Sequence, residues 1–238
     1  MSANKQGQSD NTLLRALSQP EEKKFMADST MVTLSDGKVL AAYGERLRHV
    51  YFPVGGYIGL TTSVDGNVLL GIGMVGDEGM LGTFPAFGID VSPLNATVLL
   101  AGSALRMDVA VFRRHLVANP ELLRMLKRYC CVMISQLAQA SSCNRFHPVE
   151  QRLARRLLMM QDRAHSNVLR ITQLSLADLL GVRRPAVSAA ASELQNHNWI
   201  HYSRGDITIL DRDALKSASC SCYERDNSIY QDIMNKPL

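Results

Sequence analysis

Residues 173–197 of this 238-residue chain, QLSLADLLGVRRPAVSAAASELQNH, have the most informative sequence pattern. Apolar residues recur at helical spacing on both sides of Gly181, which predicts helices over 173–180 and 184–197. The glycine supplies the left-handed backbone of a tight turn between them, and Pro185 falls in the first turn of the second helix. Two short helices joined by a turn that contains glycine are typical of a helix-turn-helix.

A β-hairpin is predicted directly after the second helix. The runs WIHY (199–202) and ITIL (207–210) are rich in β-branched and aromatic residues, and they flank the turn signal SRGD (203–206). A hairpin in this place would form the wing of a winged helix-turn-helix.

Two further helices are predicted upstream. Asn119 is a good N-cap and Pro120 fits a first helical position, so a long helix is expected from there to about Asn144. Residues 146–148 (FHP) should form a hinge, because proline forbids a continuous helix there. An amphipathic helix follows over 149–162, and its arginines are expected to point outward: Arg152, Arg155 and Arg156.

The long helix carries a heptad pattern, which predicts a dimer seam. Its apolar residues alternate in steps of three and four, namely Leu123, Leu126, Cys130, Met133, Leu137 and Ala140. One face of the helix must pack on its own chain, but the regular spacing favours a parallel pair of helices. Cys130 would then face the equivalent cysteine of the second helix, as a thiol packed in the interface.

Residues 31–108 have a sequence pattern typical of β-strands. Seven short β-rich runs alternate with turn signals, which predicts a β-sandwich or barrel. The runs are 31–34, 39–43, 50–52, 57–63, 68–74, 97–101 and 104–108, and the turns are 35–37, 53–56, 65–67 and 76–79. Two short helices, broken at 18–20, are expected over 11–28 before the first strand.

Charge is distributed unevenly along the chain, which has a formal net charge of +4. No lysine or arginine lies between His49 and Leu105, whereas residues 145–212 contain ten arginines, no lysine and six acidic residues. Such an arginine-rich segment indicates either a polyanionic partner or a solvated surface. No apolar run reaches the length of a membrane span, and the polar residues 1–10 lack the apolar core of a secretion signal. We therefore expect a cytoplasmic protein with no membrane partner.

The five cysteines all lie at or after residue 130, so no disulfide framework is expected in the N-terminal half. Cys220 and Cys222 form a C-x-C pair without a second pair at metal-ligand spacing. The sequence therefore favours a structural or surface pair over a zinc site, and we expect neither a metal nor a cofactor.

Residues 169–210 resemble the winged helix-turn-helix of the Crp/Fnr transcription regulators, and the order of elements resembles that family over about residues 13–223. The segment LLGVRR (179–184) followed by Val187 carries most of the resemblance. Further matching stretches are VYFP (50–53), GDEGMLG (76–82), NP (119–120), CNR (143–145) and VEQRLAR (149–155).

The resemblance implies an α+β fold and a homodimer that binds double-stranded DNA at an inverted-repeat operator, with RNA polymerase as a further partner. An N-terminal antiparallel β-roll (jelly-roll-like) would form a sensor domain at 11–118. A dimerisation helix at 119–144, a winged helix-turn-helix domain at 149–223 and a C-terminal tail at 224–238 would follow.

The ligand pocket departs from the family's cyclic-AMP binders. Those proteins hold the phosphate with a Gly-Glu-Leu loop and an Arg-Ser pair, and they read adenine with hydroxyls on the long helix. The matching positions here are Gly79, Met80, Leu81 and Gly82, then Leu94 and Asn95, then Leu137 and Ala138. A cyclic phosphate would be buried there without a cation, so we do not expect cyclic AMP as the effector. A small apolar or neutral ligand, or none, stays open.

Other cofactors and functions have little support. The family's oxygen sensors need N-terminal cysteines as iron–sulfur ligands, and none is present. His49 and His115 are conceivable haem ligands, although a hydrogen-bonded or surface role is more common for a lone histidine. A metal-dependent β-roll enzyme would need several histidines in the barrel, and residues 50–114 contain none. An interaction module whose helix-turn-helix does not read DNA stays open.

The helix over 183–197 is expected to lie in the major groove. Arg184 can bond a guanine bidentately, Arg183 should meet phosphate, and Ser188 offers a hydroxyl. Pro185 and Ala189 can touch a thymine methyl group. Backbone contacts are expected from the start of the first helix and from the wing, at Thr172, Ser175, His201, Tyr202 and Arg204.

Overall fold

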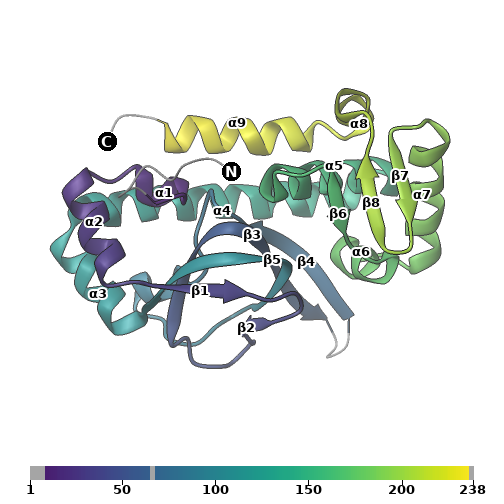
Figure 1. The fold of residues 1–238 in the computed structure, drawn as a ribbon. Helices are drawn as coiled ribbons and strands as arrows, with labels where there is room; N and C mark the ends of the chain where they lie inside the picture. Colours follow the sequence, from purple (N-terminus) through teal and green to yellow (C-terminus); the bar gives the residue numbers. More distant parts are fainter. Residues whose placement is uncertain (1–8, 65–67, 236–238) are drawn as a thin grey trace. The chain divides into compact units, whose positions relative to one another are not determined.

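The computed structural model describes residues 9–64 and 68–235, which divide into two compact units (Figure 1). Unit 1 comprises residues 9–58 and 74–130, and unit 2 comprises residues 59–64, 68–73 and 131–235. The chain passes from one unit to the other inside strands β3 and β4 and inside helix α4. None of the described helices is both long and apolar enough to span a membrane.

Unit 1 begins with the two predicted short helices, α1 (Thr12–Arg15) and α2 (Gln19–Ala27). The Asn11 side chain caps α1 by accepting hydrogen bonds from the amides of Leu13 and Leu14. Pro20 lies in the first turn of α2, where a proline costs no helical hydrogen bond.

The seven predicted β runs form five strands: β1 (Thr30–Leu34), β2 (Val39–Ala41), β3 (His49–Val64), β4 (Val68–Val75) and β5 (Asn95–Asp108). Their order is β1-β5-β3-β4, and β2 also pairs with β5. Strand β1 runs antiparallel to β5 with Thr30 opposite Arg106. The predicted turn at 65–67 lies outside the described residues, while those at 35–37 and 76–79 are confirmed.

The predicted turn at 53–56 is wrong, because β3 continues through it. Gly56 adopts a φ of 71°, and a Cβ there would collide with the carbonyl oxygens of Leu100 and Ala101. Across the sheet, a Cβ on Gly102 would collide with the backbone of Gly55. The glycines therefore allow a close approach of two long strands, and the chain does not reverse there. For the same reason the two predicted runs on either side of Gly102 form one strand, β5.

A 3-10 helix η1 (Phe84–Phe87) precedes β5, and helix α3 (Val109–Ala118), which the sequence analysis missed, follows it. Helix α4 (Pro120–Phe146) is the predicted long helix and ends two residues later than expected. The Asn119 side chain accepts hydrogen bonds from the amides of Glu121 and Leu122, both at 3.0 Å, which confirms the cap. The break before Pro148 is also confirmed.

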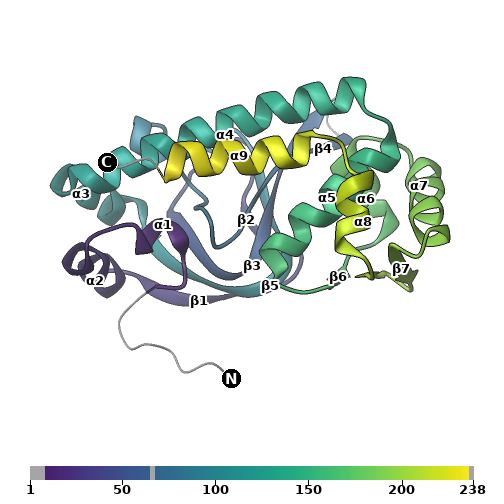
Figure 2. The same ribbon diagram turned by 90° about the horizontal axis from the view of Figure 1, so that it is seen from above.

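Unit 2 contains α5 (Val149–Ala164), β6 (Val168–Arg170), α6 (Gln173–Leu180), α7 (Arg184–Asn196), β7 (Ile200–Ser203), β8 (Asp206–Ile209), α8 (Arg212–Ala218) and α9 (Cys222–Met234). The predicted helices and the wing are confirmed. Strand β6, which was not predicted, joins the wing in a sheet of order β6-β8-β7. Most of the expected tail at 224–238 is instead helix α9, whose start lies beside the last turns of α4 (Figures 1 and 2).

The three arginines of α5 that were expected to point outward do not, so that prediction is wrong. Arg152, Arg155 and Arg156 are buried, since α5 packs against α6, α7, α8 and α9. Arg152 donates to the carbonyl oxygen of Leu180, and Arg156 donates to that of Leu179 at 3.3 Å. Those carbonyls end helix α6, where they lack helical donors and carry the negative end of the dipole. The third side chain, Arg155, forms an ion pair with Asp226 of α9.

Candidate nucleic-acid interface

The helix-turn-helix is built from α6, the turn at Gly181 and α7. The Thr172 hydroxyl caps α6 by accepting a hydrogen bond from the Ser175 amide at 3.1 Å, and the two hydroxyls lie 2.9 Å apart. Gly181 ends the helix in the left-handed conformation with a φ of 62°. The turn therefore depends on glycine, as the sequence indicated.

Helix α7 buries one face and exposes its start. Val187, Ala190, Ala191 and Leu194 are buried, whereas the residues expected at DNA bases or phosphates are exposed, namely Arg183, Arg184, Pro185 and Ala189. The free amides of a helix N-terminus attract anions, so the arginines and the backbone favour the same kind of ligand.

Ser188 is positioned by a residue that the sequence analysis missed. Its half-buried hydroxyl donates to the Gln173 side-chain oxygen at 2.7 Å. Gln173 is the first residue of α6, so this bond connects the starts of the two helices. No local pattern could reveal it, because the two residues are fifteen positions apart.

The wing turns at Arg204 and Gly205, whose φ values are 50° and 92°. Two successive positive φ angles are typical of the turns that match the twist of a hairpin. Arg204 and His201 are exposed, and Tyr202 is half-buried. The Tyr202 amide donates to the Gln195 side chain at 2.8 Å, which ties the wing to α7.

Few of the arginines between 145 and 212 are available to a polyanion. Three of the four arginines of α5 are buried, and Arg212 bonds Asp162 at 2.7 Å. Among the described residues, the arginine side chains of this segment that are exposed and make no hydrogen bond or ion pair are those of Arg145, Arg183, Arg184 and Arg204. Three of these four therefore lie at the start of α7 and at the wing.

In unit 1, the residues expected to line a ligand pocket instead pack against, or form hydrogen bonds with, other parts of the protein. Met80 and Leu81 are buried, and the Leu81 amide donates to the Tyr51 carbonyl at 2.8 Å. A Cβ on Gly79 would collide with the Tyr129 hydroxyl, and Gly82 has a φ of 94°. Leu94 and Asn95 are half-buried, and the Asn95 side chain accepts from the Tyr43 amide at 2.9 Å.

The two histidines considered for haem have protein partners. His49 Nε2 lies 3.1 Å from Asp108 Oδ1, and the buried His115 places its Nε2 2.8 Å from Asp28 Oδ2. Phe25 packs against the His115 ring, with 5.1 Å between the ring centroids. Both histidines therefore have a carboxylate partner within the protein.

The predicted dimer seam is only partly accessible. Leu126 and Ala140 are buried within the chain, because α4 turns one face inward and the 3.6-residue period carries part of the seam onto that face. Leu123, Cys130 and Met133 are half-buried, and Leu137 is 46% exposed. Ile134, which was not in the predicted seam, is 67% exposed.

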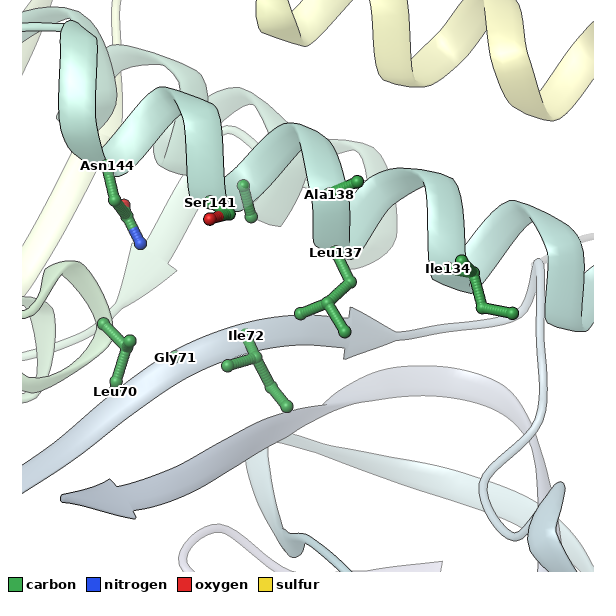
Figure 3. Close-up of a pocket in the computed structure, with 9 residues that line it drawn as sticks. Leu70, Gly71, Ile72, Ile134, Leu137, Ala138, Ser141 and Asn144 are labelled. Atoms are coloured by element: carbon green, nitrogen blue, oxygen red, sulfur yellow. The ribbon is translucent and has the colours of Figure 1, made fainter.

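An apolar cleft of about 610 Å³ lies beside these exposed residues (Figure 3). Leu137 points from α4 toward Ile72 on β4, and the lining is completed by Leu70, Gly71, Ile134, Ala138, Ala140, Ser141 and Asn144. None of the lining residues is charged. The cleft therefore offers apolar surface and few hydrogen-bonding groups.

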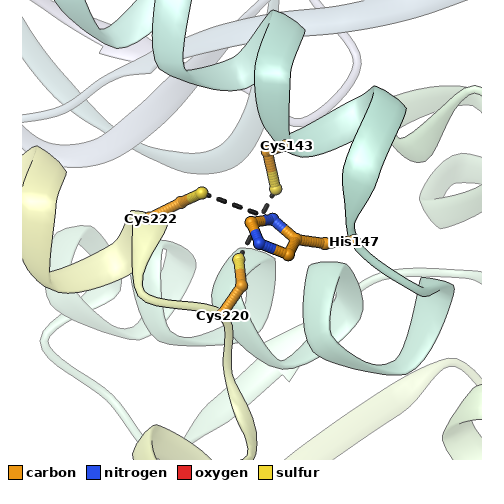
Figure 4. A group of neighbouring side chains, drawn as sticks. All are labelled: Cys143, His147, Cys220 and Cys222. Atoms are coloured by element: carbon orange, nitrogen blue, oxygen red, sulfur yellow. Dashed lines mark hydrogen bonds between the residues drawn. The ribbon is translucent and has the colours of Figure 1, made fainter.

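A cluster of sulfur and nitrogen ligands in unit 2 was not predicted from the sequence. Cys220 and Cys222 do have a second pair at metal-ligand spacing, Cys143 and His147, so the expectation that no such pair exists is wrong (Figure 4). The hydrogen bond with Cys220 lowers the pKa of Cys143 to about 5, which favours the thiolate. The C-x3-H spacing was the signal that could have revealed the cluster.

Comparison with known proteins agrees with this architecture. Residues 151–218 match the family model described as a Crp-like helix-turn-helix domain. No curated protein matches the sequence. The structure of FixK2 from Bradyrhizobium japonicum is 15% identical, with a TM-score of 0.68 over 81% of this chain and 98% of that chain.

Two further solved structures are similar. One is a putative Crp/Fnr-family transcriptional regulator from Eubacterium rectale, which is 16% identical with a TM-score of 0.68 over 88% of this chain and 98% of that chain. The other is CLP, the c-di-GMP-responsive global regulator of Xanthomonas campestris, which is 16% identical with a TM-score of 0.67 over 81% of this chain and 99% of that chain. This chain therefore has the fold of the Crp/Fnr family of transcriptional regulators and contains a Crp-like helix-turn-helix domain.

Proposed function

We propose that this protein is a homodimeric transcription regulator that binds a specific DNA sequence through α7. The main support for this proposal is that the side chains of Arg183 and Arg184, at the start of α7, are exposed and unpaired within a Crp-like helix-turn-helix. Two cations that are free of protein partners, at a helix N-terminus, suit a duplex with phosphates at its rim and base edges in its groove.

The roles of the DNA-facing residues follow from their positions. Arg184 reaches the base edges and bonds the O6 and N7 atoms of a guanine, while Arg183 contacts a phosphate. Ser188, held by Gln173, and the small side chains of Pro185 and Ala189 leave room for the groove floor. Backbone contacts come from Thr172, Ser175, His201, Tyr202 and Arg204, and these contacts set the register.

Dimerisation through α4 would place two such helices on one face of the duplex. The exposed Ile134 and Leu137 and the adjoining apolar cleft support a second copy of this chain as their occupant, because they are aliphatic and uncharged. We assign residues 119–144 to dimerisation, 11–118 to sensing and 149–223 to DNA binding. The dimer acts in the cytoplasm, and RNA polymerase is its proposed partner at promoters.

Cyclic AMP is not the proposed effector. Met80 is buried where the family's binders place a carboxylate, and no lysine or arginine lies between His49 and Leu105. A buried phosphate without a cation would cost several kcal/mol. An effector of this protein would therefore be apolar or neutral.

Selection from a random duplex library tests the proposal. The purified protein is incubated with the library, the retained DNA is sequenced, and binding is repeated over a range of salt concentrations. We expect an inverted repeat with half-site centres about 34 Å apart, and an affinity that falls steeply with salt. Retention of no DNA above background would instead favour an interaction module with a non-reading helix-turn-helix.

A further inference from the structure

Four potential metal ligands converge in unit 2 from three places in the chain (Figure 4). Cys143 lies in the last turn of α4, and His147 follows that helix directly before Pro148. Cys220 lies between α8 and α9, and Cys222 is the first residue of α9. Their ligand atoms all lie within 4.8 Å of one another, so one small ion could contact all four.

The separations within the cluster match tetrahedral zinc. Zn–S bonds of about 2.3 Å and Zn–N bonds of about 2.0–2.1 Å place neighbouring ligand atoms roughly 3.5–3.8 Å apart in a tetrahedron. The Sγ atoms of Cys143 and Cys220 are 3.5 Å apart, and Cys222 Sγ lies 3.5 Å from His147 Nδ1. The side chains therefore need only small adjustments to coordinate one ion.

The surroundings suit a closed site with negative charge. All three cysteines are buried, and the Gln139 amide donates to Cys222 Sγ at 2.9 Å. Three thiolates and one Zn²⁺ carry a net charge of −1. Arg152 and Arg155 are buried nearby and interact electrostatically with Cys143 and Cys220. Because Arg155 is already paired with Asp226, Arg152 is the cation that balances the net charge of −1 in the interior.

We propose that Cys143, His147, Cys220 and Cys222 bind one Zn²⁺ ion per chain in a structural, four-coordinate site. Four protein ligands leave no open position for a substrate, so the ion serves stability and not catalysis. It joins the end of α4 and the residue after it to the start of α9 and the residues before that helix. Metal binding at this site does not depend on which DNA sequence α7 recognises.

A disulfide and an iron–sulfur cluster fit the geometry of these cysteines less well than a zinc site does. A disulfide requires a sulfur separation of about 2.05 Å, and one between Cys143 and Cys220 would leave His147 and Cys222 without a role. In an iron–sulfur cluster the four ligands are divided among at least two iron atoms, which holds the ligands of different irons farther apart than the 4.8 Å within which this group lies.

Metal analysis of the untagged, full-length protein tests the site. We expect one zinc per chain in the wild type and in Cys131→Ser, a matched control at an exposed cysteine of α4. We expect at least a tenfold loss of zinc in Cys143→Ser and in Cys220→Ser. Equal zinc in Cys220→Ser and the wild type would overturn the proposal, as would stoichiometric iron with sulfide or a Cys143–Cys220 disulfide found by mass spectrometry.

A second measurement remains informative if the cysteine variants fail to fold. Wild-type protein is stripped with a chelator and titrated with Co²⁺, and one equivalent should produce the visible bands of tetrahedral cobalt bound to thiolates. His147→Cys should keep the bound metal, because it supplies a fourth thiolate, whereas His147→Ala should bind Zn²⁺ at least tenfold more weakly. The absence of tetrahedral bands in the wild type, or unchanged affinity in His147→Ala, would contradict the four-ligand assignment.

Discussion

Arg155 of α5 and Asp226 of α9 form an ion pair in which both side chains are almost completely buried, with 7% and 3% exposure. Burial raises the pKa of Asp226, although the charge of Arg155 opposes that rise. Because removal of either partner leaves a buried charge uncompensated, the pair fastens α9 to the centre of unit 2.

Replacement of one partner should therefore be more harmful than replacement of both. We expect Asp226→Leu to lower the free energy of unfolding by about 3–5 kcal/mol, because Arg155 keeps its charge in the interior. The double variant Arg155→Met/Asp226→Leu should recover most of that loss. Urea unfolding followed by circular dichroism measures both, and a double variant no more stable than Asp226→Leu would show that the charge of Arg155 is not the cause.

The close approach of β3 and β5 in unit 1 gives a second prediction. A Cβ on Gly102 would collide with the backbone of Gly55, whereas a Cβ on Gly55 would lie 4.0 Å from the nearest atom. Gly102→Ala should therefore cost about 1–3 kcal/mol, while Gly55→Ala, on the facing strand, should cost less than about 1 kcal/mol. Thermal unfolding of the two variants compares them, and equal losses would contradict the one-sided crowding.

The sequence predicted those parts of the fold that have local signals. Gly181 and Pro185 mark the turn and the start of α7, and Asn119 marks the start of α4. The arginines of α5 were misplaced because their amphipathic pattern resembles that of a surface helix, and their partners, such as Leu180 and Asp226, come from distant segments. Cys143 and Cys220 were not connected because 77 residues separate them and only the tertiary fold brings them together.

The surface of α4 gives a third prediction. Leu126 is buried within the chain, so a charge there would disturb folding and could not test dimerisation. Ile134→Glu/Leu137→Glu instead places charges on exposed aliphatic positions and should yield folded monomers that bind operator DNA at least tenfold more weakly. Val117→Glu, at a valine of α3 that is 87% exposed, is the matched control and should stay dimeric. Sedimentation velocity distinguishes the two, and a double variant that remains dimeric would place the interface elsewhere.

Cyclic AMP should leave this protein unchanged. A ligand that binds the folded state raises its stability by about 2.7 kcal/mol when present at a hundred times its Kd, which is readily seen in a melting curve. Because the segment from His49 to Leu105 offers no lysine or arginine to a phosphate, we expect neither a shift in Tm nor a gain in DNA affinity with added nucleotide. A concentration-dependent rise in Tm would contradict the proposed loss of the phosphate site.

The last prediction separates sequence reading from general affinity for DNA. Arg184 and Arg204 both have exposed, unpaired side chains, but Arg184 starts the helix that is proposed to enter the groove and Arg204 lies at the tip of the wing. Arg184→Ala should weaken operator binding by about 1–3 kcal/mol per half-site and relax the preference at one base pair, because a bidentate base contact is lost. Arg204→Ala should weaken binding to operator and random DNA alike.

Salt titration completes this comparison. Each lost phosphate contact lowers the slope of log affinity against log salt by about one, so Arg204→Ala should flatten the slope by that amount per subunit. Arg184→Ala should leave the slope nearly unchanged, because its contact is with a base. Fluorescence anisotropy on operator and scrambled duplexes measures both quantities. If Arg184→Ala weakened binding to the two duplexes equally and flattened the slope, Arg184 would be a phosphate contact, and another residue of α7 would have to read the base.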